Sequence, residues 1–135
     1  MNLSQIGVIG TSKKEDERRV PIHPDHLIRL PQHVRTKLIF ETGYGVPFDI
    51  SDEDIAARSG GIASRKSILS DIGSVIIAKP VLSDLKEMKP GGMIWGYPHC
   101  EQQQEITQTA IDRKLTLIAF EDMFVWTPTG AMGRH

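Results

Sequence analysis

The chain has 135 residues, enough for one domain with an ordinary hydrophobic core but few for a two-domain enzyme. Its 16 basic and 17 acidic residues nearly balance, so charge gives no reason to expect nucleic acid or a membrane surface as partner. No apolar run approaches the roughly 20 residues that span a bilayer. Cys100, the single cysteine, cannot form an internal disulfide, and residues 1–5 do not resemble a signal peptide, so we expect a cytoplasmic protein.

Short apolar segments rich in isoleucine and valine alternate with polar segments along the chain. The predicted strands are Ile6–Ile9, Lys37–Phe40, Ser74–Ala78, Met93–Gly96 and Thr116–Phe120. Their nearly continuous apolar character is typical of strands that are covered on both faces. The alternation predicts an α/β fold of the three-layer, Rossmann-like (flavodoxin-like) type, a parallel sheet with helices on both faces.

Helix signals fill the segments between these strands. The predicted helices are Pro24–Leu30, Ser51–Arg58, Ser64–Ser70, Asp84–Met88 and Glu101–Lys114. The first begins with proline, which suits a first helical turn, and the second with a serine cap and acidic residues. The last is the clearest, because Ile106, Ala110 and Ile111 share one face.

The residues after Phe120 carry no further helix signal and end soon after a strand-like segment. Two interpretations are open. Either the fold is incomplete because the sequence stops before its next element, or residues 127–135 form a frayed tail. We favour the first, which predicts a sheet that is incomplete at the C-terminus.

Two glycine-containing segments resemble nucleotide-binding loops only superficially. Residues 7–13 have the wrong spacing for a phosphate-binding loop, and Gly43-Tyr44-Gly45 lacks the third glycine of a dinucleotide fingerprint. We interpret both as turn glycines and expect no cofactor-binding residue in this chain.

The histidines and the cysteine do not have the spacing of a metal site, so we expect no metal. His23, His26 and His33 are interpreted as surface residues around one helix. Cys100 is interpreted as a small buried side chain rather than a nucleophile.

Three side chains fit a site for carboxylate binding and proton transfer, namely Arg19, Lys79 and His99. Each is expected at or just past the end of an apolar strand, where open α/β sheets bind ligands. Guanidinium binds carboxylate through two hydrogen bonds, and lysine and imidazole can move protons. Each also has an ordinary explanation: Arg19 could pair with Glu15 or Glu17, and Lys79 could extend into solvent.

Several motifs, in order and spacing, resemble the N-terminal domain of the alanine dehydrogenase and pyridine nucleotide transhydrogenase family. The resemblance covers nearly the whole chain. Its landmarks are Ile6-Gly7-Val8 and residues 17–24, 40–45, 51–54, 79–80, 90–93, 97–99 and 118–121.

Within the family, residues 18–21 and 43–50 look most like N5-(carboxyethyl)ornithine synthase, which condenses pyruvate reductively with an amine. Pro98-His99-Cys100 is also similar to lysine-forming saccharopine dehydrogenases. Alanine dehydrogenases have Lys-Glu-Pro where this chain has Lys79-Pro80, which argues against a plain alanine dehydrogenase.

The resemblance implies that residues 1–135 form the substrate-side domain of an NAD(P)-dependent dehydrogenase acting on C–N bonds. By motif, Arg19 would hold the substrate carboxylate, Lys79 would polarise the carbonyl or accept a proton, and His99 would transfer protons. The substrate would be a 2-oxo acid or amino acid. NADP or NAD would be bound by a domain absent from this chain, which alone would be inactive.

We expect a homo-oligomer. The alternative function is a non-catalytic module that binds an amino acid or keto acid, or another subunit, without a cofactor domain. A weaker option is the transhydrogenase branch, which would need a membrane partner.

Overall fold

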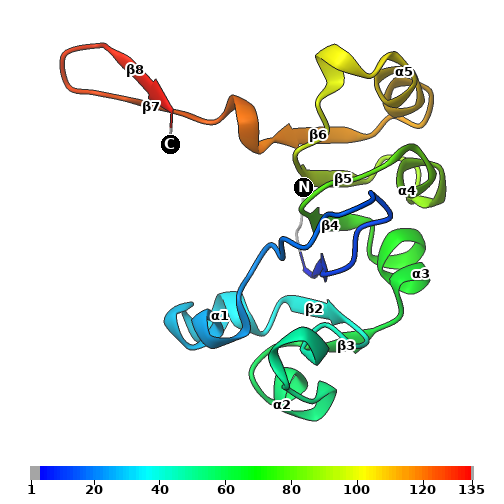
Figure 1. Cartoon of the computed structure of the whole chain (residues 1–135), viewed down its shortest axis with the longest axis vertical. Coiled ribbons are helices and arrows are strands. Elements are labelled where there is room, and N and C mark those ends of the chain that lie inside the picture. The colour runs from blue at the N-terminus through cyan, green and yellow to red at the C-terminus, as the bar shows by residue number, and fades with distance from the viewer. Residues whose placement is uncertain (1–3, 135) are drawn as a thin grey trace.

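The computed structural model describes residues 4–134, so four residues of the predicted 1–135 domain, 1–3 and His135, lie outside it. A six-stranded parallel sheet forms the centre, in the order β3-β2-β1-β4-β5-β6 (Figure 1). The strands are β1 (Ile6–Ile9), β2 (Leu38–Glu41), β3 (Gly61–Ala63), β4 (Ser74–Ile77), β5 (Met93–Gly96) and β6 (Thr116–Ala119). The predicted α/β class and parallel sheet are confirmed.

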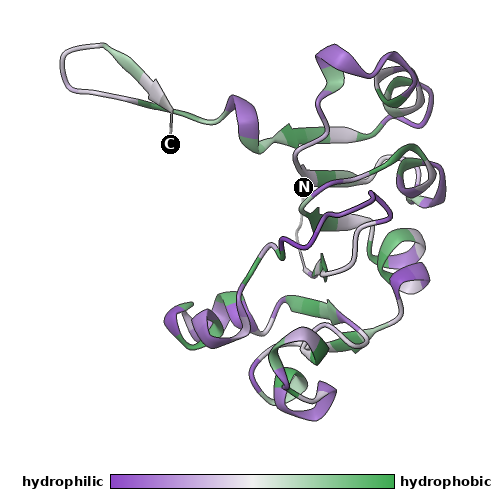
Figure 2. Ribbon diagram, in the orientation of Figure 1, coloured by the Kyte–Doolittle hydropathy of each residue, from purple (hydrophilic) through white to green (hydrophobic). Residues whose placement is uncertain are grey.

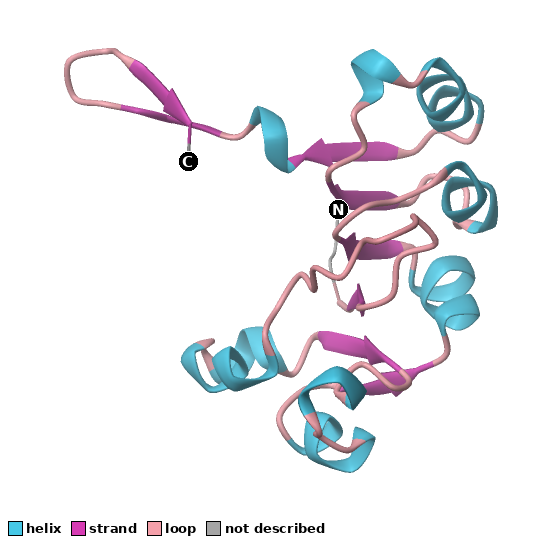
Figure 3. Cartoon of the chain, viewed as in Figure 1, coloured by secondary structure: helices cyan, strands magenta, loops and turns pink. Residues whose placement is uncertain are grey.

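Helical segments connect the strands and form the two outer layers (Figure 3). They are η1 (Pro24–Arg29), α1 (Gln32–Arg35), η2 (Val46–Phe48), α2 (Asp52–Ala57), α3 (Arg65–Ser67), η3 (Ile68–Ile72), α4 (Leu82–Glu87), η4 (Cys100–Gln102), α5 (Gln104–Asp112) and η5 (Phe120–Asp122). In Figure 1, α3, α4 and α5 lie in a row along one side of the sheet, and α1 and α2 lie near β2 and β3.

Two hydrophobic clusters fill the two interfaces between sheet and helices. Val8 and Ile9 are adjacent in β1 and belong to different clusters, because successive strand residues point to opposite faces. The larger cluster joins β1, β4 and β5 to η3, α4 and α5, and the smaller one joins β1 and β2 to η1 and α2. Figure 2 shows the apolar colour concentrated on the strands and the inward faces of the helices.

One half of the sheet carries a partly exposed apolar row. Ile76, Trp95 and Ile118 lie side by side on β4, β5 and β6, since each is the register partner of the next. All three are half-buried, while Val8, which is next to Ile76 on β1, is fully buried under the smaller cluster. Among residues 4–134, therefore, the helices cover this face over β1 and β2 but leave it open over β4 to β6.

The C-terminal segment forms an arm rather than the frayed tail that was the alternative to an incomplete fold. Strands β7 (Phe124–Trp126) and β8 (Met132–Arg134) pair in an antiparallel hairpin that extends away from the sheet (Figure 1). The turn uses Gly130 at φ 82°, a conformation that suits glycine. The hairpin was not predicted, although Thr127-Pro128-Thr129-Gly130 has the composition of a turn.

Strand β3 was not predicted, because it has only three residues and begins with glycine, which is uncommon in strands. Tertiary pairing creates it: Ile39, Phe40 and Glu41 of β2 provide its register partners. Short strands of low intrinsic propensity form only where a neighbouring strand supplies the hydrogen bonds.

The helices depart from their predicted bounds in several places, among them α4, which begins at Leu82 rather than Asp84. Pro24–Leu30 is a 3-10 helix rather than an α-helix, and α1 follows it immediately after Pro31. The predicted helix Ser64–Ser70 becomes α3 and then a π-helix, η3. The predicted helix Glu101–Lys114 is divided at Gln103 into η4 and α5.

A buried carboxylate joins three of the loops at the carboxyl edge of the sheet. Asp84 is fully buried, and it accepts hydrogen bonds from Arg65 Nη2 at 2.6 Å and from the Val81 backbone N–H at 2.9 Å. Lys13 Nζ lies 3.7 Å from the same carboxylate. The Asp84 carboxylate therefore fixes α3, the start of α4 and the loop after β1 relative to one another.

We predict that Asp84→Ala lowers the free energy of unfolding by about 3–5 kcal/mol, because it removes the nearer of the two carboxylates that pair with the largely buried Arg65 guanidinium. The measurement is urea denaturation. Glu87→Ala is the matched control, since Glu87 pairs with Lys13 at the surface, and it should cost less than about 1 kcal/mol. Equal losses in the two variants would contradict a special role for Asp84.

Candidate functional site

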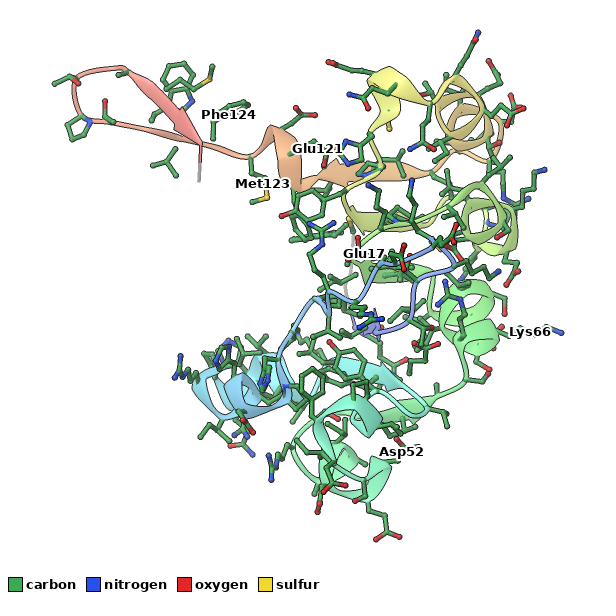
Figure 4. The ribbon with its side chains drawn as sticks, viewed as in Figure 1. Glu17, Asp52, Lys66, Glu121, Met123 and Phe124 are labelled. Carbon is green, nitrogen blue, oxygen red and sulfur yellow. The ribbon has the colours of Figure 1, made fainter. Side chains whose placement is uncertain are left out.

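Lys79 and His99 follow neighbouring strands at the carboxyl edge of the sheet, as predicted. Lys79 lies two residues after β4 and His99 three residues after β5, and both are half-buried. The expectation for Arg19 is corrected in one respect: it does not lie at a strand end but ten residues beyond Ile9, in the long loop that follows β1. Figure 4 shows Glu17 on this loop, near the centre of the sheet.

The loop after β1 is tied to the segment after β4. The Ser12 hydroxyl donates a hydrogen bond to the Lys79 carbonyl at 2.9 Å. The backbone N–H of Tyr97, which follows β5, donates to the Ala78 carbonyl at 3.0 Å. These bonds hold the three chain segments that carry Arg19, Lys79 and His99 together at one edge of the sheet.

Arg19 forms an ion pair with Glu17, which the sequence offered as the alternative to a role in carboxylate binding. Its Nε and Nη2 donate to the two carboxylate oxygens of Glu17 at 2.8 and 2.7 Å, and its backbone N–H donates to Oε1 at 3.0 Å. The guanidinium also lies over the ring of Tyr97, with Cζ 5.0 Å from the ring centroid. Arg19 is therefore held in place and still 59% exposed.

The positive charges of Arg19 and Lys79 both lower the pKa of Glu17. The hydrogen bonds from the Arg19 guanidinium, followed by smaller electrostatic effects that include the Lys79 ammonium, lower the pKa of Glu17 from 4.5 to about 2. The same pair raises the pKa of Arg19. The sequence named Glu17, with Glu15, only as a possible ion-pair partner of Arg19, and its contact with Arg19 makes it a member of the site.

His99 adopts an unusual backbone conformation. Its φ of 49° and ψ of 48° lie in the left-handed region, which non-glycine residues seldom adopt and which often marks a functional position. Its backbone N–H donates to Glu121 Oε1 at 2.8 Å, and its Nδ1 lies 3.6 Å from the same oxygen. Glu121 was assigned no role from the sequence, although its carboxylate holds His99 in this strained position.

A cavity of about 470 Å³ opens beside His99. Its acidic lining residues are Glu101, Glu121 and Asp122. Cys100 also lines it, and burial raises the pKa of the Cys100 thiol. A thiol with a raised pKa is a poor nucleophile at neutral pH, which supports the interpretation of Cys100 as a structural side chain.

The histidines near η1 pack against their neighbours. His23 contacts His26 and the edge of Phe48, with ring centroids 5.3 and 4.5 Å apart. Within residues 4–134, no group of three His, Cys, Asp or Glu side chains is arranged to hold a metal ion. The absence of a metal stays a prediction. The same described range contains no helix long and apolar enough to cross a bilayer.

The turn after β1 is unsuited to a dinucleotide. A pyrophosphate at a first βα turn needs free backbone N–H groups, but here the N–H groups of Gly10 and Thr11 both donate to Glu41 Oε2, at 3.0 Å each. Gly7 is not a turn glycine as predicted: it lies within β1, and any Cβ there would collide with Ile68. These residues do not fit NAD(P), in keeping with a cofactor held by another domain.

We predict that Arg19→Met returns the pKa of Glu17 from about 2 toward 4.5, since the largest stabiliser of the carboxylate is removed. An NMR titration of the Glu17 carboxyl carbon measures it. Because the folded pKa lies below the ordinary value, the pair stabilises the fold above pH 4.5 and loses this contribution as the pH falls toward 2. Arg18→Met is the control, and an unchanged pKa in Arg19→Met would contradict the pairing.

Comparison with known proteins identifies relatives of the chain. A sequence model of the family "Alanine dehydrogenase/PNT, N-terminal domain" matches residues 8–128. An alanine dehydrogenase of Staphylococcus haemolyticus is 28% identical over 109 residues, and alanine dehydrogenase 2 of Staphylococcus aureus (strain USA300) is 29% identical over 109 residues. Each alignment covers 80% of this chain, which spans 29% of the length of either relative.

Solved structures give the same result. The chain matches an L-alanine dehydrogenase with a TM-score of 0.73 and 25% identity, over 94% of this chain and 34% of that protein. It matches a transhydrogenase from Sinorhizobium meliloti with a TM-score of 0.70 over 87% of this chain and 35% of that one, where 15% identity shows the fold alone. Because the family match covers most of the chain and the folds agree, the chain belongs to the family of alanine dehydrogenase/PNT N-terminal domains.

Proposed function

We propose that this chain is the substrate-binding domain of an NAD(P)-dependent amino-acid dehydrogenase. One observation supports the proposal: Arg19 and His99 both lie against Tyr97 at the carboxyl edge of the sheet, and Lys79 follows Ala78, whose carbonyl accepts the Tyr97 N–H. A carboxylate-binding guanidinium beside an amine and an imidazole suits a 2-oxo acid or amino acid.

The residues have separate roles in the proposed reaction. Arg19 binds the carboxylate of the 2-oxo acid, and Lys79 donates a hydrogen bond to its keto oxygen. When an amine nitrogen adds to the keto carbon, the electron pair of the C=O bond moves to oxygen, which takes a proton from Lys79. His99 accepts a proton from the nitrogen and returns one to the hydroxyl, which leaves as water and produces a C=N bond.

Reduction of the C=N bond requires a hydride that these residues do not supply. The nicotinamide donor would be bound outside the described residues, because the backbone N–H groups after β1 are occupied by Glu41. We therefore propose that this chain alone lacks dehydrogenase activity.

Two features favour an amine larger than ammonia as the second substrate. The cavity beside His99 has three acidic lining residues, which suits a cationic amine such as ornithine or lysine. Lys79-Pro80 also lacks the glutamate of alanine dehydrogenases. We propose a reductive condensation like that of N5-(carboxyethyl)ornithine synthase, with an alanine dehydrogenase-like reaction using ammonia as the alternative.

We predict that Lys79→Met and His99→Ala each lower turnover about 10²–10⁴-fold, in a polypeptide that extends through a cofactor domain, because each removes a proton-transfer group. Arg19→Met should raise the KM for pyruvate. The assay follows nicotinamide oxidation with pyruvate and ornithine, lysine or ammonia, using NADH and NADPH.

Lys66→Met and His26→Ala are the matched controls. Both residues are exposed, and Figure 4 shows Lys66 pointing away from the sheet. Near-normal turnover in Lys79→Met and His99→Ala would refute the assigned roles. The amine that gives the highest kcat/KM decides between the condensation and the alanine dehydrogenase-like reaction.

The exposed arm favours a second role in association with another copy of the chain. Phe124, Trp126 and Met132 share one face of the hairpin and are 39%, 69% and 57% exposed. An isolated two-stranded hairpin is marginally stable in water, so an apolar face of this kind gains stability by packing.

We predict that the chain sediments as a homo-oligomer and that Phe124→Ser with Trp126→Ser shifts it toward monomer. Analytical ultracentrifugation measures the change. Ile28→Ser replaces an equally exposed apolar residue outside the arm, 69% exposed, and should leave the oligomer intact. A monomeric wild-type chain would contradict the prediction.

A further inference from the structure

Tyr97 touches both of the residues that are proposed to bind substrate and transfer protons. Its ring centroid lies 5.0 Å from Arg19 Cζ and 6.5 Å from the centroid of the His99 ring, with 27° between the two rings. Its backbone N–H also donates to the carbonyl of Ala78, the residue before Lys79. We propose that Tyr97 is a positioning residue that sets the place of Arg19 and His99 for the substrate, an inference that rests on the proposed function.

The contacts of Arg19 show how it can be held and still bind a ligand. A guanidinium has five N–H donors arranged along two edges. Glu17 occupies the edge formed by Nε and Nη2, and the Tyr97 ring covers a face. The edge that includes Nη1 remains for a carboxylate, and the side chain is 59% exposed. Tyr97 thus restrains the guanidinium without using a donor.

Tyr97 is itself fixed from several directions. Phe120 packs edge-on against its ring, with centroids 5.5 Å apart and planes at 66°. The backbone bond to Ala78 anchors it to the end of β4. A half-buried ring fixed in this way keeps the distance between the carboxylate-binding group and the imidazole constant, and that distance has to match the substrate.

A substitution of Tyr97 tests positioning more cleanly than one of Glu17. Removing the Glu17 carboxylate would strengthen the attraction of Arg19 for any anion, whatever its effect on orientation. Tyr97→Leu changes no charge, and Tyr97→Phe retains the ring. Tyr97→Met is a second ring-free variant with a longer, unbranched side chain, in case the leucine variant does not fold.

The experiment uses the 135-residue chain and two NMR measurements at pH 6. The order parameter of the Arg19 Nε–Hε group is measured in the free protein, and pyruvate is then titrated as the probe. We expect Tyr97→Leu and Tyr97→Met to lower the order parameter and to weaken pyruvate binding at least about two- to fivefold, the equivalent of an exposed cation–π contact. Tyr97→Phe should match the wild type in both, as should Ile28→Ser, which changes an exposed apolar side chain outside the site and the arm.

The two measurements separate this inference from the proposed function. An unchanged order parameter in both ring-free variants would overturn the positioning role, whether or not pyruvate binds. Failure of the wild-type chain to bind pyruvate, with the order parameter falling as expected, would refute the proposed substrate class and leave the positioning of Arg19 supported. A loss of order in Tyr97→Phe as large as in Tyr97→Leu would also overturn the inference, since the ring is then not what holds Arg19.

Discussion

The site depends on a buried carboxylate that makes the loop after β1 turn back over the sheet. Glu41, only 6% exposed, accepts the backbone N–H groups of Gly10 and Thr11 and the Thr11 hydroxyl. Arg65 donates to the Thr11 carbonyl and hydroxyl and reaches Asp84 with its other terminal nitrogen. Buried charges are stable only when they are paired and hydrogen-bonded, so this network allows one path for the loop that carries Arg19.

The same network determines which part of the carboxyl edge of the sheet is free to bind a ligand. Where related folds place a phosphate on the N–H groups after the first strand, this chain places its own carboxylate. The ligand site is displaced toward the ends of β4 and β5, where Lys79 and His99 lie. Glu17 then offsets the positive charge of Arg19, and Glu121 accepts the backbone N–H of His99, so that both residues are held in fixed positions.

Much of the fold follows from local patterns. The strands at Ile6–Ile9 and Met93–Gly96 were predicted with their observed bounds, because a short continuous apolar run between polar segments is typical of a buried strand. The Ser51 cap was likewise predicted, and its hydroxyl accepts from the Asp54 N–H. Strand β3 and the division at Gln103 were not predicted, since pairing with β2 and packing of α5 outweigh their weak local signals.

By itself the sequence determined the fold class, the parallel sheet, the family resemblance and three candidate residues, since hydrophobic period and residue chemistry are local properties. Only the tertiary structure decided that Glu17 pairs with Arg19, that Glu121 fixes His99 and that Tyr97 contacts both Arg19 and His99. Two of these contacts, Glu121 with His99 and Tyr97 with Arg19, join segments that are distant in sequence. Their geometry depends on the path of the loop after β1, which long-range hydrogen bonds fix and no local pattern encodes.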